Sequence, residues 1–146
     1  MNRRYVLLVD DEQNILSALK REIGDWAYEH KLEVITAGLA KTGLEILAEK
    51  GQDTVIVVSD LKMPQMKGSD FLQIVRDTYP DIVTILLTGF SETEEVIKAV
   101  RAGIFNYILK PWDSEYLLSE INKAFVHGEL KRQNDQYLKT IQDELK

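Results

Sequence analysis

The sequence contains no cysteine, which excludes disulfide bonds, thiolate catalysis and zinc sites built on cysteine. It also lacks a long apolar run, since stretches such as Tyr5–Val9 are far too short to span a bilayer. The arginines before that run are followed too soon by Asp10 and Asp11, with no small-residue cleavage site, to form a signal peptide. We therefore expect a cytoplasmic protein that does not bind membranes.

Positive charge is scarce as well. The 146 residues include 18 Lys and Arg against 24 Asp and Glu, giving a formal net charge of −6. This balance argues against direct binding of nucleic acid through a basic face. A hydrophobic content of 45% suits one globular domain with a single core.

Five short apolar runs alternate with segments of helical periodicity. The expected strands are Tyr5–Val9, Leu32–Ala37, Val55–Ser59, Ile82–Leu87 and Tyr107–Leu109. The expected helices are Gln13–Tyr28, Ala40–Glu49, Ser69–Thr78, Thr93–Ala102 and a long helix from Ser114 onward. Three runs are apolar almost throughout, which is typical of parallel strands buried on both faces. The pattern predicts an α/β fold: a doubly wound five-stranded parallel sheet in the flavodoxin-like order 2-1-3-4-5, with an extended C-terminal helix.

The last expected helix changes character near Gly128. A row of residues recurs there at spacings of three and four amid mostly charged and polar neighbours: His127, Leu130, Asn134, Tyr137 and Ile141. The spacing fits a short coiled-coil seam with Asn134 at an interior position, and it fits a solvated helical tail equally well. The prediction is a domain over residues 1–127 and a helical extension over 128–146. We expect that extension to lead toward a further domain outside this sequence, with a stand-alone domain that carries a helical tail as the alternative. The extension could also pair two copies of the chain.

Polar side chains gather where the expected strands end. Asp10 and Asp11 follow the first strand, Asp60 the third, Thr88 the fourth and Lys110 the fifth. In the predicted strand order these ends meet at one edge of the sheet, where ligands of such folds bind. Three carboxylates held close together need protons or a cation. Ligands that offer only oxygen suit a hard cation, Mg²⁺ first, with Mn²⁺ or Ca²⁺ as alternatives.

Such a site, with a lysine and a hydroxyl beside it, has the parts needed for phosphoryl transfer. Asp60 is the best candidate for the acceptor, because aspartate can form an aspartyl phosphate. It is a single acid at the end of a central strand, whereas Asp10 and Asp11 form a pair that is better placed to bind a metal ion. Lys110 would offset charge on the phosphoryl oxygens, and the Thr88 hydroxyl would donate a hydrogen bond to one of them. Lys110 precedes Pro111, and a cis bond there costs little and could direct the lysine into the site.

These residues resemble the receiver domain of two-component response regulators. The matching segments are VLLVDDE (Val6–Glu12), VVSDLKMPQMKG (Val57–Gly68), ILLTGF (Ile85–Phe90) and AGIFNYILKPW (Ala102–Trp112). The resemblance implies that Asp60 takes a phosphoryl group from the phosphohistidine of a sensor histidine kinase or a phosphotransfer protein. It also implies Mg²⁺ held by Asp11, Asp60 and the backbone carbonyl of Lys62, with Asp10 acting through a metal-bound water. The protein would then catalyse only its own phosphorylation and dephosphorylation.

The resemblance further implies a conformational switch. Thr88 would move toward the phosphoryl group and Tyr107 would rotate inward, shifting the surface of the fourth helix, fifth strand and fifth helix to regulate a partner or output domain. A half-buried sheet aromatic is the alternative interpretation of Tyr107. Lys67 and Asn106 depart from the residues most frequent in the family, and neither belongs to the expected site.

The segment after Thr88 supports two local interpretations. Phe90 could lean over the site and slow the attack of water on a phosphoaspartate. Ser91 with Glu94 fits a capping box at the start of the fourth helix, while Gly103 fits its C-terminal stop.

Two other functions use similar residues. A Mg²⁺-dependent phosphohydrolase with an aspartate nucleophile usually has a second aspartate two residues later, and Lys62 stands there instead. A flavin-binding carrier shares the predicted fold, but no loop here offers the hydroxyl-rich phosphate-binding segment it would need.

Overall fold

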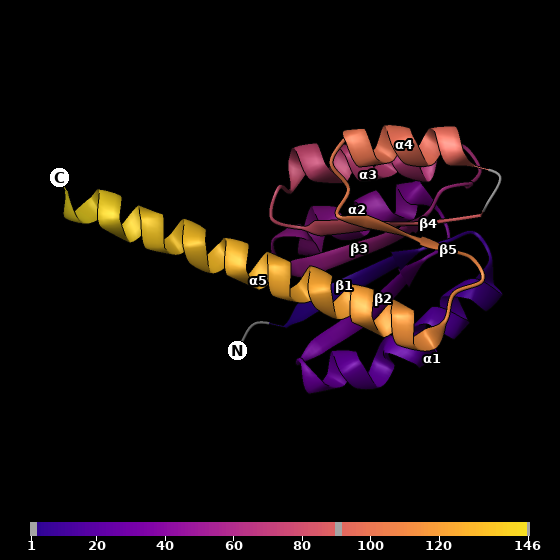
Figure 1. Ribbon diagram of the computed structural model, residues 1–146, viewed down its shortest axis with the longest axis horizontal. Helices are drawn as coiled ribbons and strands as arrows, with labels where there is room; N and C mark the ends of the chain where they lie inside the picture. Colours follow the sequence, from indigo (N-terminus) through magenta and orange to yellow (C-terminus); the bar gives the residue numbers. More distant parts are fainter. Residues whose placement is uncertain (1–2, 90–91, 146) are drawn as a thin grey trace.

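The computed structural model describes residues 3–89 and 92–145 (Figure 1). Its sheet has five strands, β1 (Arg4–Val9), β2 (Leu32–Ala37), β3 (Thr54–Asp60), β4 (Val83–Thr88) and β5 (Asn106–Leu109). All four pairings are parallel and the order is β2-β1-β3-β4-β5. The predicted fold class and strand order are confirmed, and each strand end lies within one residue of its predicted position.

Five α-helices follow the strands. They are α1 (Gln13–Glu29), α2 (Ala40–Lys50), α3 (Gly68–Thr78), α4 (Thr93–Arg101) and α5 (Ser114–Glu144), with the short 3₁₀ helix η1 (Gly51–Asp53) before β3. Helices α1 and α5 cover one face of the sheet, and α2, α3 and α4 cover the other (Figure 1). This arrangement follows from the right-handed β-α-β connections that parallel strands require.

The alternation of side chains along the strands produces two buried clusters. Val6 and Leu8 of β1 pack with α1 and α5, while Leu7 and Val9 pack with α2 and α3. Strand β3 is buried at every position from Thr54 to Asp60. The central strands are therefore fixed from both sides, and so are the polar residues at their C-terminal ends.

The ends of α4 were partly predictable. Gly103 follows the helix with φ +97°, a left-handed conformation that glycine adopts at no steric cost, so the predicted stop is confirmed. The capping box proposed for Ser91 lies outside the described residues. The N-cap position of α4 is occupied by Glu92, whose side chain makes no capping hydrogen bond.

Helix α5 extends well beyond the body of the domain (Figure 1). Its contacts with the body continue as far as Arg132: Arg4 donates to Glu129 at 2.6 Å, and Arg132 donates to the carbonyl of Thr54 at 3.2 Å. Leu130 and Tyr137 of the predicted seam are 60% and 66% exposed. A boundary between residues 127 and 128 thus remains a prediction. Over residues 3–89 and 92–145, no helix combines the length and apolarity needed to cross a membrane.

Candidate functional site

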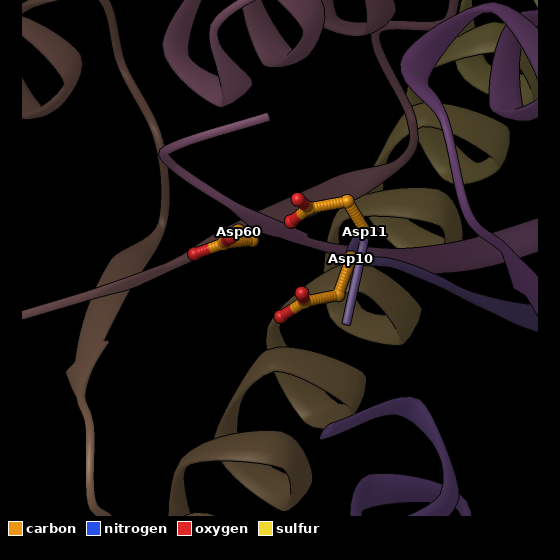
Figure 2. Close-up of side chains that lie close together, drawn as sticks. All are labelled: Asp10, Asp11 and Asp60. Atoms are coloured by element: carbon orange, nitrogen blue, oxygen red, sulfur yellow. The ribbon is translucent and has the colours of Figure 1, made fainter. Parts of the chain in front are cut away.

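Three carboxylates meet at the C-terminal edge of the sheet (Figure 2). Asp10 and Asp11 directly follow β1, and Asp60 is the last residue of β3. One oxygen from each carboxylate lies within 4.8 Å of the other two. Asp10 is fully buried and Asp60 nearly so, whereas Asp11 is exposed to solvent. The structure therefore brings together the three acids that the sequence placed at strand ends.

Lys110 inserts its ammonium group between two of these acids. Its Nζ donates to Oδ2 of Asp10 at 3.0 Å and to Oδ1 of Asp60 at 2.9 Å. Lys110 follows β5 and is positioned by its backbone N–H, which donates to the carbonyl of Thr88 at 2.8 Å. The Lys110–Pro111 peptide bond is cis. Asp10 is oriented by the backbone N–H of Glu12, which donates to Oδ1 at 2.9 Å.

The charges in this cluster do not balance. Burial raises the pKa of Asp60 from 3.8 to about 6; the hydrogen bond from Lys110 opposes this rise and the charge of Asp10 adds to it. Burial disfavours the charged form of Lys110, yet its hydrogen bonds to Asp60 and Asp10 outweigh that effect and raise the pKa of Lys110. One ammonium thus faces three carboxylates, and a further cation would relieve the remaining repulsion.

The donor set fits Mg²⁺. This ion binds oxygen at about 2.0–2.1 Å in octahedral geometry and keeps several waters, so opposite ligands lie roughly 4 Å apart. The 4.8 Å spread of the carboxylate oxygens is close to that separation. Asp11 is exposed to solvent, so its carboxylate is accessible to a hydrated ion. Lys62 lies in the loop directly after β3, and its backbone carbonyl remains a predicted ligand.

The loop that follows Asp60 folds back against it. The N–H of Gly68 donates to the carbonyl of Leu61 at 2.8 Å, and α3 begins at Gly68. A Cβ atom at position 68 would lie 1.9 Å from the carbonyl oxygen of Asp60. Only glycine fits such a close approach of two backbone segments. The glycine therefore fixes the backbone that presents the Asp60 carboxylate.

The Thr88 hydroxyl is already engaged by a residue that the sequence did not single out. It donates to Oε2 of Glu92 at 2.5 Å, and the N–H of Gly89 donates to the same oxygen at 3.1 Å. The ammonium of Lys62 lies 3.2 Å from Oε1 of Glu92. Burial raises the pKa of Glu92, but the bonds from Thr88, Gly89 and Lys62 outweigh it and lower that pKa. The only feature of the sequence that could have indicated this contact is the position of Glu92, an acid four residues after Thr88 at the start of a helix.

Tyr107 of β5 lies beside α4 and not within the acid cluster. Its side chain is 37% exposed and lines a hollow of about 410 Å³ between α4 and β5, together with Val96, Ile97, Val100 and Leu109. The inward rotation predicted for Tyr107 remains a prediction. Phe90, expected to lean over the site, lies outside the described residues.

A second contact missed by the sequence ties the lysine loop to α1. Trp112 Nε1 and the Ser114 hydroxyl both donate to the carboxylate of Glu22. The loop that carries Lys110 is thereby attached to the helix that follows Asp10 and Asp11. No pattern in the sequence indicated this pairing, because the residues are far apart along the chain.

Many known proteins resemble this chain in sequence and in fold. The family model described as response regulator receiver domain matches residues 6–122. The hydrogenase transcriptional regulatory protein HoxA of Cupriavidus necator is 34% identical over 120 residues, 82% of this chain and 23% of HoxA. The DNA-binding transcriptional regulator NtrC of Proteus hauseri is 30% identical, over 91% of this chain and 27% of NtrC. The chain thus spans about a quarter of the length of these curated relatives.

Solved structures agree with the sequence relatives. A response regulator receiver domain protein from Clostridium thermocellum superimposes with a TM-score of 0.78 at 31% identity, covering 87% of this chain and 98% of that one. The signal receiver domain of an HD domain-containing protein from Pseudomonas fluorescens gives a TM-score of 0.81 at 30% identity, covering 91% and 94%. The segment matched by the family model contains Asp10, Asp11 and Asp60, and the chain belongs to the response regulator receiver domain family.

Proposed function

We propose that this domain is a phosphoryl-accepting signalling switch of a two-component system, with Asp60 as the acceptor. The observation that carries the proposal is the position of Lys110, held between Asp10 and Asp60 at the edge of a three-carboxylate cluster. The phosphoryl donor is the phosphohistidine of a sensor histidine kinase or a phosphotransfer protein. The domain is not a turnover enzyme and acts only on its own phosphorylation state.

The residues divide the chemistry among them. A carboxylate oxygen of Asp60 attacks phosphorus, the bond from phosphorus to the donor imidazole nitrogen breaks, and the electron pair of that bond leaves with the imidazole. Lys110 offsets charge on the phosphoryl oxygens, and the Thr88 hydroxyl donates to one of them. Asp11, Asp60 and the Lys62 carbonyl would hold Mg²⁺, with Asp10 acting through a bound water. That ion, when bound, neutralises charge on the cluster and on the transferred group.

The output of the switch is the face formed by α4, β5 and α5. A rearrangement of Thr88 reaches this face through α4, and Tyr107 rotates into the space that Thr88 vacates. The curated relatives HoxA and NtrC are named as transcriptional regulators, so we propose that this face acts on a partner or on an output domain. The acidic receiver domain itself makes no direct contact with nucleic acid. The extension beyond Arg132 connects to such a domain or pairs two copies of the chain.

The test is phosphorylation by a small phosphodonor in the presence of Mg²⁺. We expect mass spectrometry to show one added phosphoryl group, lost in Asp60→Asn and retained in the matched surface variant Asp81→Asn. Unchanged labelling of Asp60→Asn would refute the assignment of the acceptor. Sustained hydrolysis of unrelated phosphate esters would instead favour a phosphohydrolase. The sequence argues against that function, because Lys62 occupies the position where such enzymes usually have their second aspartate.

A further inference from the structure

The carboxylate of Glu92 engages the Thr88 hydroxyl, the donor that a phosphoryl group on Asp60 would use under the proposed function, together with the neighbouring N–H of Gly89. Its Oε2 accepts a hydrogen bond from the Thr88 hydroxyl at 2.5 Å and another from the backbone N–H of Gly89 at 3.1 Å. Thr88 is the last residue of β4 and Gly89 follows it. Strand β4 pairs with β3, which ends in Asp60, and the N–H of Leu61 donates to the carbonyl of Leu87 at 2.9 Å. In the unphosphorylated protein, therefore, the Thr88 hydroxyl already donates to an anion that the chain itself supplies.

We propose that Glu92 is a positioning residue that keeps Thr88 and Gly89 engaged until Asp60 is phosphorylated, and so sets how readily this receiver accepts a phosphoryl group. The inference rests on the proposed function, because it concerns competition for the same donors. A hydroxyl has a single proton to donate. Thr88 cannot donate to Glu92 and to a phosphoryl oxygen at the same time.

The position of Glu92 invites a simpler interpretation, as an N-terminal cap that only stabilises α4. The contacts argue against it. The Glu92 side chain makes no hydrogen bond to the free N–H groups of the first turn of α4. It turns back toward the sheet, where its side chain is only 12% exposed, and its second oxygen pairs with the ammonium of Lys62. A solvated capping residue would not require that burial.

The consequence is a direct connection between the acceptor site and α4. Glu92 immediately precedes Thr93, and Thr93 lines the hollow between α4 and β5 with Tyr107. When a phosphoryl oxygen accepts the hydrogen bond from the Thr88 hydroxyl, the Glu92 carboxylate loses one of its three partners and is repelled by the new negative charge. The first turn of α4 then loses the bonds that hold it to β4.

Competition predicts that removing the Glu92 carboxylate makes the site easier to fill. The experiment is a titration of the whole chain with beryllofluoride in saturating Mg²⁺, followed by the amide resonance of Gly89. Glu92→Ser removes the carboxylate while keeping a residue favoured at helix N-caps, and Glu92→Gln removes only the charge. From the usual contribution of hydrogen bonds to charged groups, we expect beryllofluoride to bind roughly tenfold more tightly to Glu92→Ser, with a smaller gain for Glu92→Gln.

Glu94→Gln is the matched control, because Glu94 is an exposed acid on the same helical turn. It changes net charge equally, and we expect its affinity to stay within about twofold of the parent, as for an exposed charge. In addition, Glu92→Ser should shift the Gly89 amide in the same direction as beryllofluoride shifts it in the parent protein. A capping residue without a competing role would alter the melting temperature and leave the affinity for beryllofluoride unchanged.

The results separate the two proposals. If the parent and Asp60→Asn respond alike to beryllofluoride, the proposed function fails. If the parent binds and Asp60→Asn does not, while both Glu92 variants bind no more tightly than Glu94→Gln, the role of Glu92 alone is refuted. Should Glu92→Ser unfold, Glu92→Gln decides the matter by the same comparison.

Discussion

The ammonium of Lys110 and the carboxylate of Asp60 form a direct ion pair of 2.9 Å whose side chains are 21% and 9% exposed. The same carboxylate is a predicted ligand of Mg²⁺. A bound metal ion would therefore neutralise Asp60 as Lys110 does, and each would change the energetic effect of the other. A substitution of Lys110 should therefore change both the stability of the domain and its affinity for Mg²⁺, and both can be measured.

Replacing Lys110 by methionine should destabilise the Mg²⁺-free domain. The substitution leaves Asp10 and Asp60 without their cation, and an unpaired buried charge is costly. Because Asp60 can protonate, we expect a loss of roughly 1–3 kcal/mol in the free energy of unfolding, measured with urea at neutral pH.

Mg²⁺ should bind more tightly to Lys110→Met, since a competing positive charge is gone. Lys123→Met is the control: Lys123 pairs with Glu120 but is 63% exposed, so its loss should change stability by less than about 1 kcal/mol. Equal stability of the two variants would contradict a structural role for Lys110.

Asp60 should make the Mg²⁺-free domain less stable as pH rises. Burial raises the pKa of Asp60 to about 6, above its ordinary 3.8. Between these values the folded state binds more protons than the unfolded state, so this contribution to stability is lost as pH rises from about 4 to about 6. Asp60→Asn removes the effect and should be more stable than the parent at pH 7 by roughly 1–3 kcal/mol.

Urea unfolding in chelator at pH 4 and pH 7 measures this difference, which should shrink at the lower pH. Added Mg²⁺ should stabilise the parent more than Asp60→Asn and narrow the gap at neutral pH. A gap that is independent of pH would show that Asp60 has no raised pKa.

Gly68→Ala should damage both the fold and the metal site. The added carbon would lie 1.9 Å from the carbonyl oxygen of Asp60, so the loop or the end of β3 must move. We expect a loss of about 1–3 kcal/mol in stability, or more, together with weaker binding of Mg²⁺ in calorimetry. In contrast, Gly24 of α1 has nothing within 4 Å of the added carbon, and Gly24→Ala should stabilise by roughly 0.5–1 kcal/mol. A Gly68→Ala protein with unchanged Mg²⁺ affinity would refute the argument.

Two truncations of α5, after His127 and after Gln133, should differ in their effect on thermal stability. A chain ending at His127 loses Glu129 and Arg132, which bind Arg4 and the Thr54 carbonyl, and its melting temperature should fall by several degrees. A chain ending at Gln133 keeps these contacts and should melt like the parent. Sedimentation of the same three proteins tests the seam, since a coiled coil gives a dimer only for the parent. If all three proteins are monomers, the coiled-coil interpretation is wrong and the extension is a solvated helical tail.

Much of the fold was predictable because its signals are local. Apolar runs such as VIVV in β3 require burial on both sides, which only a parallel sheet between two helical layers provides. The acid cluster was predictable for a related reason: once the strand order is fixed, the C-terminal ends of β1, β3, β4 and β5 must meet. Topology alone therefore positions Asp10, Asp60 and Lys110.

What could not be predicted depends on side-chain contacts between distant segments. The bond from Trp112 to Glu22 leaves no periodic trace in the sequence. Gly128 was interpreted as the end of the packed helix, yet it is buried, with the nearest atom of Val83 only 3.0 Å from where a Cβ would lie. A glycine chosen for close packing and a glycine that ends a domain look the same in a single sequence.

The continuity of α5 has a mechanical consequence. The helix starts beside the loop that carries Lys110, crosses the domain, and runs about 18 Å past Arg132 to Glu144 at the usual rise per residue. Over that length, a tilt of about 10° at the base displaces the tip by roughly 3 Å. A continuous helix of this length therefore converts a small change of angle at the domain into a larger displacement at its C-terminal end, where a domain or partner in contact with it would be moved.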